Sequence, residues 1–128
     1  MNSVQVLTVD DQPVFREAVR ALIFSTPGFE LAGEASSGAE ALSAADRLHP
    51  DLVLLDIGLP MLDGWEVARR LRDRVGPLPI IAITGRDGPA DMHRSSEAGF
   101  VEHLNKPLDL ERLRRCLAAI EHAPATSS

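Results

Sequence analysis

Apolar and polar positions along the chain follow two periods, one typical of strands and one typical of helices. Short apolar runs rich in Val, Ile and Leu predict five strands, at 4–9, 30–35, 51–56, 79–84 and 101–105. Between them, apolar residues recur at helical spacing and predict five helices, from 13 to a stop at 27–28, and at 39–48, 65–75, 90–98 and 109–120. Alternating strands and helices joined by short connections predict an α/β domain.

The third and fourth apolar runs, "DLVLLD" and "PIIAIT", show almost no polar alternation. Such runs are typical of strands buried on both faces of a parallel sheet. Right-handed crossovers then place helices on both faces. The helical stripes predict inward-facing residues in the first and last helices: Val14, Ala18, Val19, Leu22 and Ile23, and Leu110, Leu113, Leu117 and Ile120.

Composition narrows the class of protein. A chain of 128 residues with 45% hydrophobic and 25% charged residues is expected to form one domain, here 1–121, followed by a polar tail, 122–128. The net charge of −6 argues against direct nucleic-acid binding. The single cysteine, Cys116, cannot form an internal disulfide. Because no apolar run approaches the roughly 20 residues of a membrane span and no signal-peptide pattern begins the chain, we expect a cytoplasmic protein.

Chemically active side chains gather where the predicted strands end. Asp10 and Asp11 follow the first strand, and Asp56 closes the third. Thr84 closes the fourth strand, and Lys106 follows the fifth. In doubly wound sheets ligands bind outside the carboxyl ends of the strands, so these five side chains predict one site.

Three carboxylates in one partly buried site repel each other unless one is protonated or a cation lies among them. The expected ligands are all oxygen, without a histidine or thiolate cluster, which indicates a hard divalent cation. Mg²⁺ fits better than Ca²⁺ because it needs only one or two carboxylates, keeps several waters and accepts a phosphate oxygen. The pattern therefore predicts a magnesium site that includes Asp10, Asp11 and Asp56.

Lys106 is the only lysine in a chain that has 12 arginines. A compact ammonium group on a flexible stem can contact both a carboxylate and a phosphoryl oxygen beside a metal, where a flat guanidinium would be crowded. The alternative is an ordinary surface lysine, since exposure is the commonest fate of this side chain.

Four segments in order resemble the receiver domain of two-component response regulators. They are "VLTVDDQPVFREAVRALI", "PDLVLLDIGLPMLDGWEVARRLR", "AITG" and "HLNKPLD", and the resemblance extends from residue 4 to about residue 120. It implies a flavodoxin-like doubly wound parallel sheet of five strands in the order 2-1-3-4-5, with five helices in the outer layers.

The resemblance also implies roles for individual residues. Asp56 would be the phosphoacceptor, receiving a phosphoryl group from a phosphohistidine of a sensor histidine kinase or histidine phosphotransfer protein. Asp11 and Asp56 would bind Mg²⁺ directly, Asp10 mostly through water, and Gly58 through its backbone carbonyl. Lys106 and Thr84 would hold the phosphoryl oxygens, and Thr84 would move toward them and trigger a switch.

One position departs from the common family pattern. Three residues before Lys106 the family usually has Tyr or Phe, and this chain has His103. Histidine at this position is frequent in receivers attached to hybrid sensor kinases, so His103 is the switch candidate, with a half-exposed strand histidine as the alternative. The resemblance also implies partner docking near the site, and its expected residues are Gln12, Phe15, Pro107 and Leu108. An inward-facing Phe15 is the alternative there.

The predicted function is a phosphorylation-driven switch that acts on a downstream effector protein, with a homodimer on phosphorylation left open. A phosphatase-like enzyme on a related sheet would want a second carboxylate two residues after Asp56, where this chain has Gly58. A flavodoxin-like cofactor binder would want a phosphate-cradling loop after the first strand, where "DDQPVF" places carboxylates. A receiver-like protein-binding module that is never phosphorylated remains the other alternative.

Overall fold

A computed structural model describes residues 3–57, 64–76, 78–84, 100–105 and 109–121. The described strands are β1 (Val4–Val9), β2 (Phe29–Ala35), β3 (Leu52–Asp56), β4 (Ile80–Thr84) and β5 (Glu102–Asn105). The described helices are α1 (Pro13–Phe24), α2 (Gly38–Leu48), α3 (Gly64–Val75) and α5 (Leu110–Glu121). The predicted helix at 90–98 lies outside the described residues.

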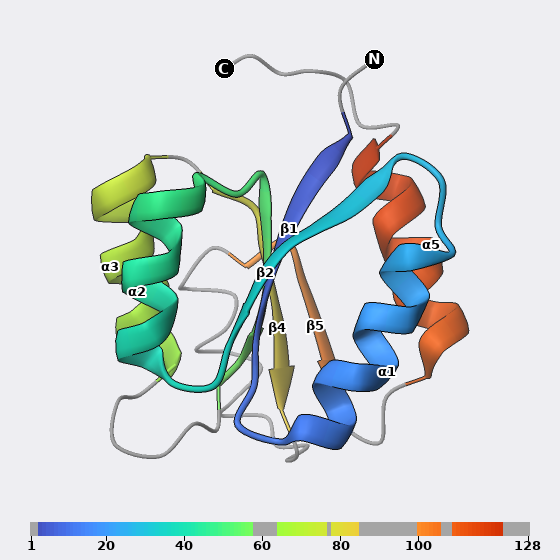
Figure 1. Ribbon diagram of the computed structural model, residues 1–128, viewed down its shortest axis with the longest axis horizontal. Coiled ribbons are helices and arrows are strands. Elements are labelled where there is room, and N and C mark those ends of the chain that lie inside the picture. The colour runs from blue at the N-terminus through green and yellow to red at the C-terminus, as the bar shows by residue number, and fades with distance from the viewer. Residues whose placement is uncertain (1–2, 58–63, 77, 85–99, 106–108, 122–128) are drawn as a thin grey trace.

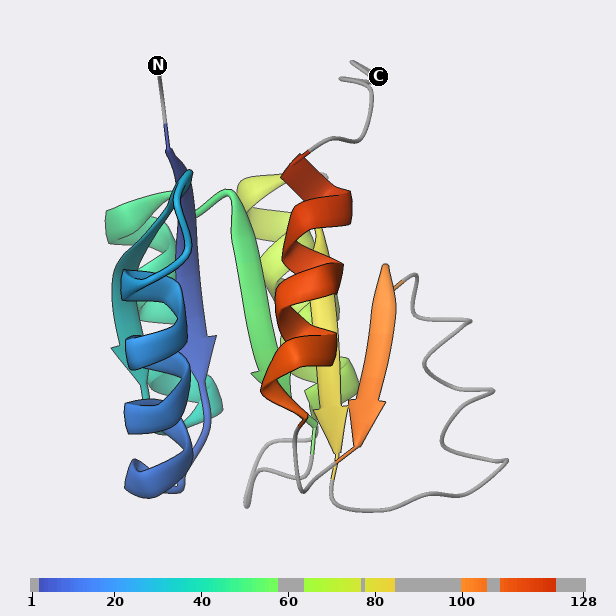
Figure 2. The same ribbon diagram turned by 90° about the vertical axis from the view of Figure 1, so that its right-hand side faces the viewer.

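The five strands form one parallel sheet in the order β2-β1-β3-β4-β5, as predicted. The order reverses between β1 and β3, which are neighbours in the sheet and appear in Figure 2 as the blue strand and the green strand beside it. β2 contains one irregularity, because Val6 pairs with Leu31 and Leu7 pairs with Gly33, which leaves Ala32 as the extra residue of a bulge. The reversal between β1 and β3 is the place where this kind of sheet opens to a ligand.

Helices cover both faces of the sheet, α2 and α3 on one side and α1 and α5 on the other (Figures 1 and 2). Alternate residues of the central strands therefore enter two separate cores. The core under α2 and α3 contains Leu7, Val9, Val53, Leu55, Ile80 and Ala82 of the strands, with Ala41, Ala45, Val67 and Leu71 of the helices. The core under α1 and α5 contains Val6, Leu52, Leu54, Ile81, Ile83 and Leu104, with Val19, Leu22, Ile23, Leu113 and Leu117.

Of the predicted inward-facing residues, two are exposed, and a third, Ala18, is partly buried and belongs to neither core. Val14 is 80% exposed and Leu110 is 40% exposed. Both belong to the first turn of their helix, where a side chain has packing neighbours on one side only. Phe15 is partly buried and packs against the core under α1 and α5, which agrees with the inward-facing alternative for this side chain.

Within the described ranges, no helix has the length and apolar character that crossing a membrane requires.

Candidate functional site

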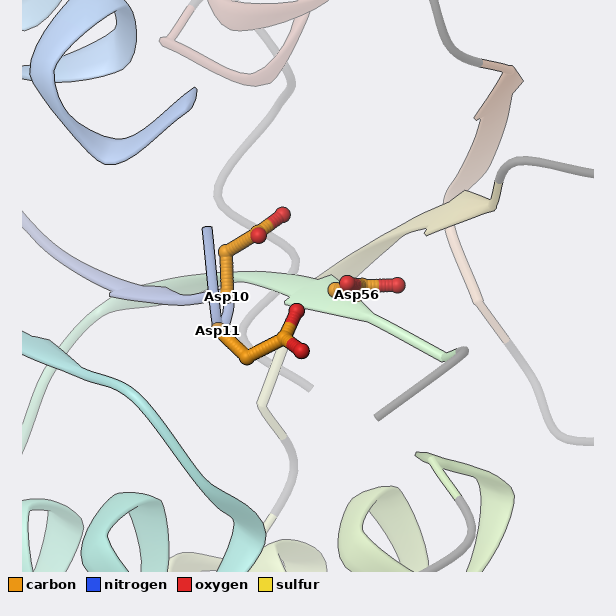
Figure 3. Close-up of side chains that lie close together, drawn as sticks. All are labelled: Asp10, Asp11 and Asp56. Carbon is orange, nitrogen blue, oxygen red and sulfur yellow. The ribbon is translucent and has the colours of Figure 1, made fainter. Parts of the chain in front are cut away.

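Asp10 and Asp56 are brought together by the pairing of β1 with β3. Val9 pairs with Leu55 in parallel register, and each aspartate is the next residue of its chain. Asp11 follows in the connection to α1, and Figure 3 shows the three carboxylates gathered at this end of the two strands. The sequence prediction that these residues meet is confirmed for the three aspartates.

The three carboxylates are close and two of them are hidden from solvent. One oxygen of each lies within 4.8 Å of the others, while Asp10 is fully buried and Asp56 is 5% exposed. Asp11 is exposed. Like charges at this separation and low dielectric destabilise one another by several kcal/mol, unless a cation or a proton offsets them. The arrangement therefore favours a bound cation over three free anions.

The donor set fits a hard divalent metal ion. Each of the three aspartates offers a carboxylate oxygen, and no histidine or cysteine belongs to this cluster of described residues. Oxygen ligands on a partly open site suit Mg²⁺, which retains waters and leaves room for a phosphate oxygen. Asp10, Asp11 and Asp56 are thus the described side chains able to hold such an ion.

The orientation of Asp10 is set by its own turn. The Gln12 backbone N–H donates a hydrogen bond of 2.8 Å to Asp10 Oδ1, and the Asp10 N–H donates to the Ala35 carbonyl at 3.0 Å. Aspartate commonly makes such a bond to the backbone two residues later, which closes a turn. This turn delivers the chain into α1, where Pro13 is the first residue.

Other predicted site residues are described in part or not at all. Thr84 is the last residue of β4, one position after the Ile83 that pairs with Asp56, so its backbone lies at the same edge as the aspartates. Gly58, Lys106, Pro107 and Leu108 lie outside the described residues.

His103 lies on β5, where it pairs with Ala82 of β4. His103 is partly buried, and both of its ring nitrogens are shielded from solvent and have no hydrogen-bond partner among the described residues. Its role as a switch stays a prediction.

The sequence reasoning missed one side chain that reaches the site. Arg16 of α1 donates from Nη1 to the backbone carbonyl of Asp10 at 2.6 Å. Arg16 lies four residues after Gln12, in the helix that follows the aspartates, and this position is the sequence signal that could have indicated its contact with the site.

Comparison with known proteins decides the family. The family described as response regulator receiver domain matches residues 6–118. The chain belongs to this family. The receiver domain is 39% identical over 127 residues to the virulence-factor transcription regulator BvgA of Bordetella pertussis, covering 96% of this chain and 60% of BvgA. It is 38% identical over 117 residues to the response regulator MprA of Mycobacterium leprae, covering 91% of this chain and 50% of MprA.

Solved structures give the same result for the fold. The signal receiver domain of NarL from Mycobacterium tuberculosis matches with a TM-score of 0.86 and 28% identity, covering 96% of this chain and 99% of that one. A LuxR-family two-component response regulator from Aurantimonas matches with a TM-score of 0.85 and 32% identity, covering 93% and 85%.

Membership in this family indicates a class of function. Response regulator receiver domains act in two-component signalling and interact with histidine kinases, so this receiver domain is a signalling switch rather than an enzyme in the ordinary sense. Its cluster of Asp10, Asp11 and Asp56 is the acidic pocket typical of phosphate-accepting response regulators. The chain spans 50–60% of the length of BvgA and MprA.

Proposed function

We propose that Asp56 accepts a phosphoryl group from a phosphohistidine of a sensor histidine kinase or a histidine phosphotransfer protein, in a Mg²⁺-dependent reaction. The observation that supports this most strongly is the burial of Asp56 within 4.8 Å of two further carboxylates at the carboxyl edge of the sheet. A buried carboxylate beside two others is stabilised by a bound cation, because the cation offsets the repulsion among them.

Phosphoryl transfer to a carboxylate needs little covalent catalysis by other groups of the protein. A carboxylate oxygen of Asp56 forms a bond to phosphorus while the bond from phosphorus to the histidine nitrogen breaks, and its electron pair stays on the imidazole. Mg²⁺, when bound, offsets the charge of the phosphoryl oxygens. The product is an aspartyl phosphate, which adds negative charge at a crowded site.

The chain's own residues would divide the work as follows. Asp11 and Asp56 would bind the metal directly, Asp10 would bind it mostly through water, and the Gly58 carbonyl would supply a further oxygen. Lys106 and Thr84 hold the phosphoryl oxygens. The support is the meeting of the three aspartates and the position of the Thr84 backbone at the same edge.

The same proposal covers the switch and the partners. Movement of Thr84 toward the phosphoryl group would change the environment of His103 and thereby bias a protein-interaction surface. The kinase or phosphotransfer protein would dock beside the site over Gln12, which is exposed, together with Phe15, Pro107 and Leu108.

The wider setting is also part of the proposal. A downstream effector protein would bind the switched surface, without direct nucleic-acid or membrane binding by residues 1–121. Phosphorylation would either leave the oligomeric state unchanged or produce a homodimer. Phosphotransfer from a sensor kinase would take place in the cytoplasm. Residues 122–128 would be a polar tail outside the domain.

Incubation with Mg²⁺ and acetyl phosphate, followed by intact mass spectrometry, tests the central claim. We expect the gain of one base-labile phosphoryl group, which requires Mg²⁺ and is absent in Asp56→Asn. Asp51→Asn is the matched control, because Asp51 is exposed and precedes the same strand at its opposite end. A wild-type chain that gains no phosphoryl group would point to the protein-binding module instead. An equal gain in Asp56→Asn would overturn the assignment of Asp56 as the phosphoacceptor.

A further inference from the structure

One guanidinium joins the acidic turn to two other elements. Arg16 Nη1 donates to the Asp10 carbonyl at 2.6 Å, and Arg16 Nε lies 3.3 Å from Glu34 Oε1 near the end of β2. The Arg16 side chain is 19% exposed and that of Glu34 is 21% exposed, so solvent competes weakly for these bonds. Arg16 therefore connects α1, the turn after β1, and β2.

Glu34 is itself held by a second arginine. Arg20 Nε and Nη2 donate to the two Glu34 carboxylate oxygens at 2.6 and 3.0 Å. The hydrogen bond from Arg20 is the largest cause that lowers the pKa of Glu34, and the charges of Arg20 and Arg16 lower it further. Glu34 is therefore a carboxylate at neutral pH and provides a fixed anchor for the planar guanidinium of Arg16.

The bond to the Asp10 carbonyl completes the restraint of that residue. The Asp10 N–H is bonded to Ala35, its Oδ1 accepts from Gln12, and its carbonyl accepts from Arg16. The Asp10 carbonyl belongs to the peptide that joins Asp10 to Asp11. Fixing this peptide limits where the carboxylate of Asp11, which is exposed and lies beyond the end of β1, can be.

We propose that Arg16, anchored by Glu34, is a positioning residue that holds the Asp10–Asp11 peptide in the geometry needed for metal binding. This deepens the proposed function and rests on its Mg²⁺ site. Arg16 contacts the site through a backbone carbonyl, so it acts on the ligands rather than on the ion. Residues that orient metal ligands in this way typically change metal affinity 10- to 100-fold when removed.

Calorimetric titration of the metal-free protein with Mg²⁺ tests the proposal. We expect Arg16→Met to raise the Kd for Mg²⁺ about 10-fold. Arg16→Lys should give an intermediate Kd, because an ammonium can keep the bond to the Asp10 carbonyl but has no second nitrogen with which to reach Glu34 as well. Glu34→Gln should also weaken binding, by a smaller factor. Arg70→Met is the matched control, since Arg70 pairs with Glu66 on the exposed face of α3.

The outcomes separate the two proposals. Binding to the wild type with an unchanged Kd in Arg16→Met would overturn the positioning role and leave the magnesium site standing. Absence of Mg²⁺ binding to the wild type would overturn both. Far-ultraviolet circular dichroism checks that each variant is folded at the titration temperature. If Arg16→Met is unfolded, the Kd values of Arg16→Lys and Glu34→Gln decide, and an unchanged Kd in both variants would overturn the positioning role of Arg16. A merely structural arginine would lower stability without this graded change in Kd.

Discussion

Among the described residues, three polar or charged side chains are buried, and they are Thr8, Asp10 and Asp56. The two aspartates belong to the candidate metal site, which gives a reason for their burial. Thr8 is the last residue but one of β1, opposite Leu54 of β3, and is 1% exposed. Its Oγ1 has no hydrogen-bond partner in the described part of the chain. A buried hydroxyl of this kind costs about 1–3 kcal/mol, because it has lost its bonds to water.

Replacing Thr8 by Val should stabilise the domain. Valine has nearly the same shape and keeps the β-branch that suits a strand, while the unsatisfied hydroxyl is removed. We expect the free energy of unfolding from urea denaturation to rise by about 1 kcal/mol.

Thr26→Val is the control for this prediction. Its hydroxyl donates to the Leu22 carbonyl at 2.6 Å, so the same substitution should lower the unfolding free energy there by about 1 kcal/mol. Destabilisation of both variants to the same extent would contradict the assignment of Thr8 as unsatisfied.

At the scale of single elements, α2 shows how local sequence fixes a helix start. Ser37 is the N-cap and its side chain accepts a hydrogen bond of 3.1 Å from the Glu40 N–H. Glu40 reaches back to the Ser36 N–H and hydroxyl, and these bonds lower its pKa. This reciprocal pattern closely resembles a capping box and satisfies N–H groups that the helix itself cannot. At the other end, His49 in the left-handed conformation (φ 48°) ends the helix.

Removal of the cap should therefore loosen α2 without changing the metal site. We expect Ser37→Ala to lower the free energy of unfolding by about 1 kcal/mol, measured by urea denaturation, and to leave the Kd for Mg²⁺ unchanged. Ser43→Ala, at an exposed position within the same helix, should leave stability equal or slightly raised because alanine has the higher helix propensity. Equal losses in both variants would show that the cap contributes nothing.

Element prediction failed mainly at helix beginnings. The periodic pattern includes Val14 and Leu110, yet both lie in the first turn of a helix and are exposed. Periodicity identifies which side of a helix is apolar, but it does not say how far the helix extends past the surface on which it packs. The central residues of the same stripes, such as Val19 and Leu113, are fully buried as predicted.

At the scale of the whole molecule, ion pairs on the surface join elements that are distant in sequence. Arg16 and Arg20 of α1 pair with Glu34 of β2, and Arg74 of α3 pairs with Asp46 of α2. Exposed pairs of this kind contribute little each, about 0–1 kcal/mol, because solvent screens them. The pairs of Glu34 are the more protected, and they connect the edge of the sheet to the helix that follows the acidic turn.

Acid should remove the contribution of Glu34. Its pKa is lowered from the ordinary 4.5, so its stabilising effect is complete above about pH 4.5 and is lost as the pH falls through the lower pKa of the folded state. We expect Glu34→Gln to be less stable than the wild type by at most about 1 kcal/mol at neutral pH, with the difference shrinking in acid. Urea denaturation at a series of pH values measures it.

Glu30→Gln is the comparison for this pH series. Glu30 lies on the same strand, and its hydrogen-bond partners Ser3 and Gln5 are neutral. If the free energy of unfolding of Glu34→Gln differs from that of the wild type by the same amount at every pH, the ion-pair account is contradicted.

The sequence by itself determined the class of fold, the strand positions and the meeting of Asp10, Asp11 and Asp56. The reason is that a parallel sheet brings the carboxyl ends of its strands to one edge, so a carboxylate that closes a buried strand is placed by local pattern alone. The family resemblance added the strand order, which the structure confirms.

Only the tertiary structure decided which of the many arginines reaches the site and which side chains of the first helical turns are buried. These depend on how α1 lies against β2, and the contact joins Arg16 to Glu34, 18 positions later in the chain, a separation that neither propensity nor periodicity encodes. Arg16 reaches the Asp10 carbonyl because Glu34 holds its other edge, and that arrangement exists only once the helix is packed on the sheet.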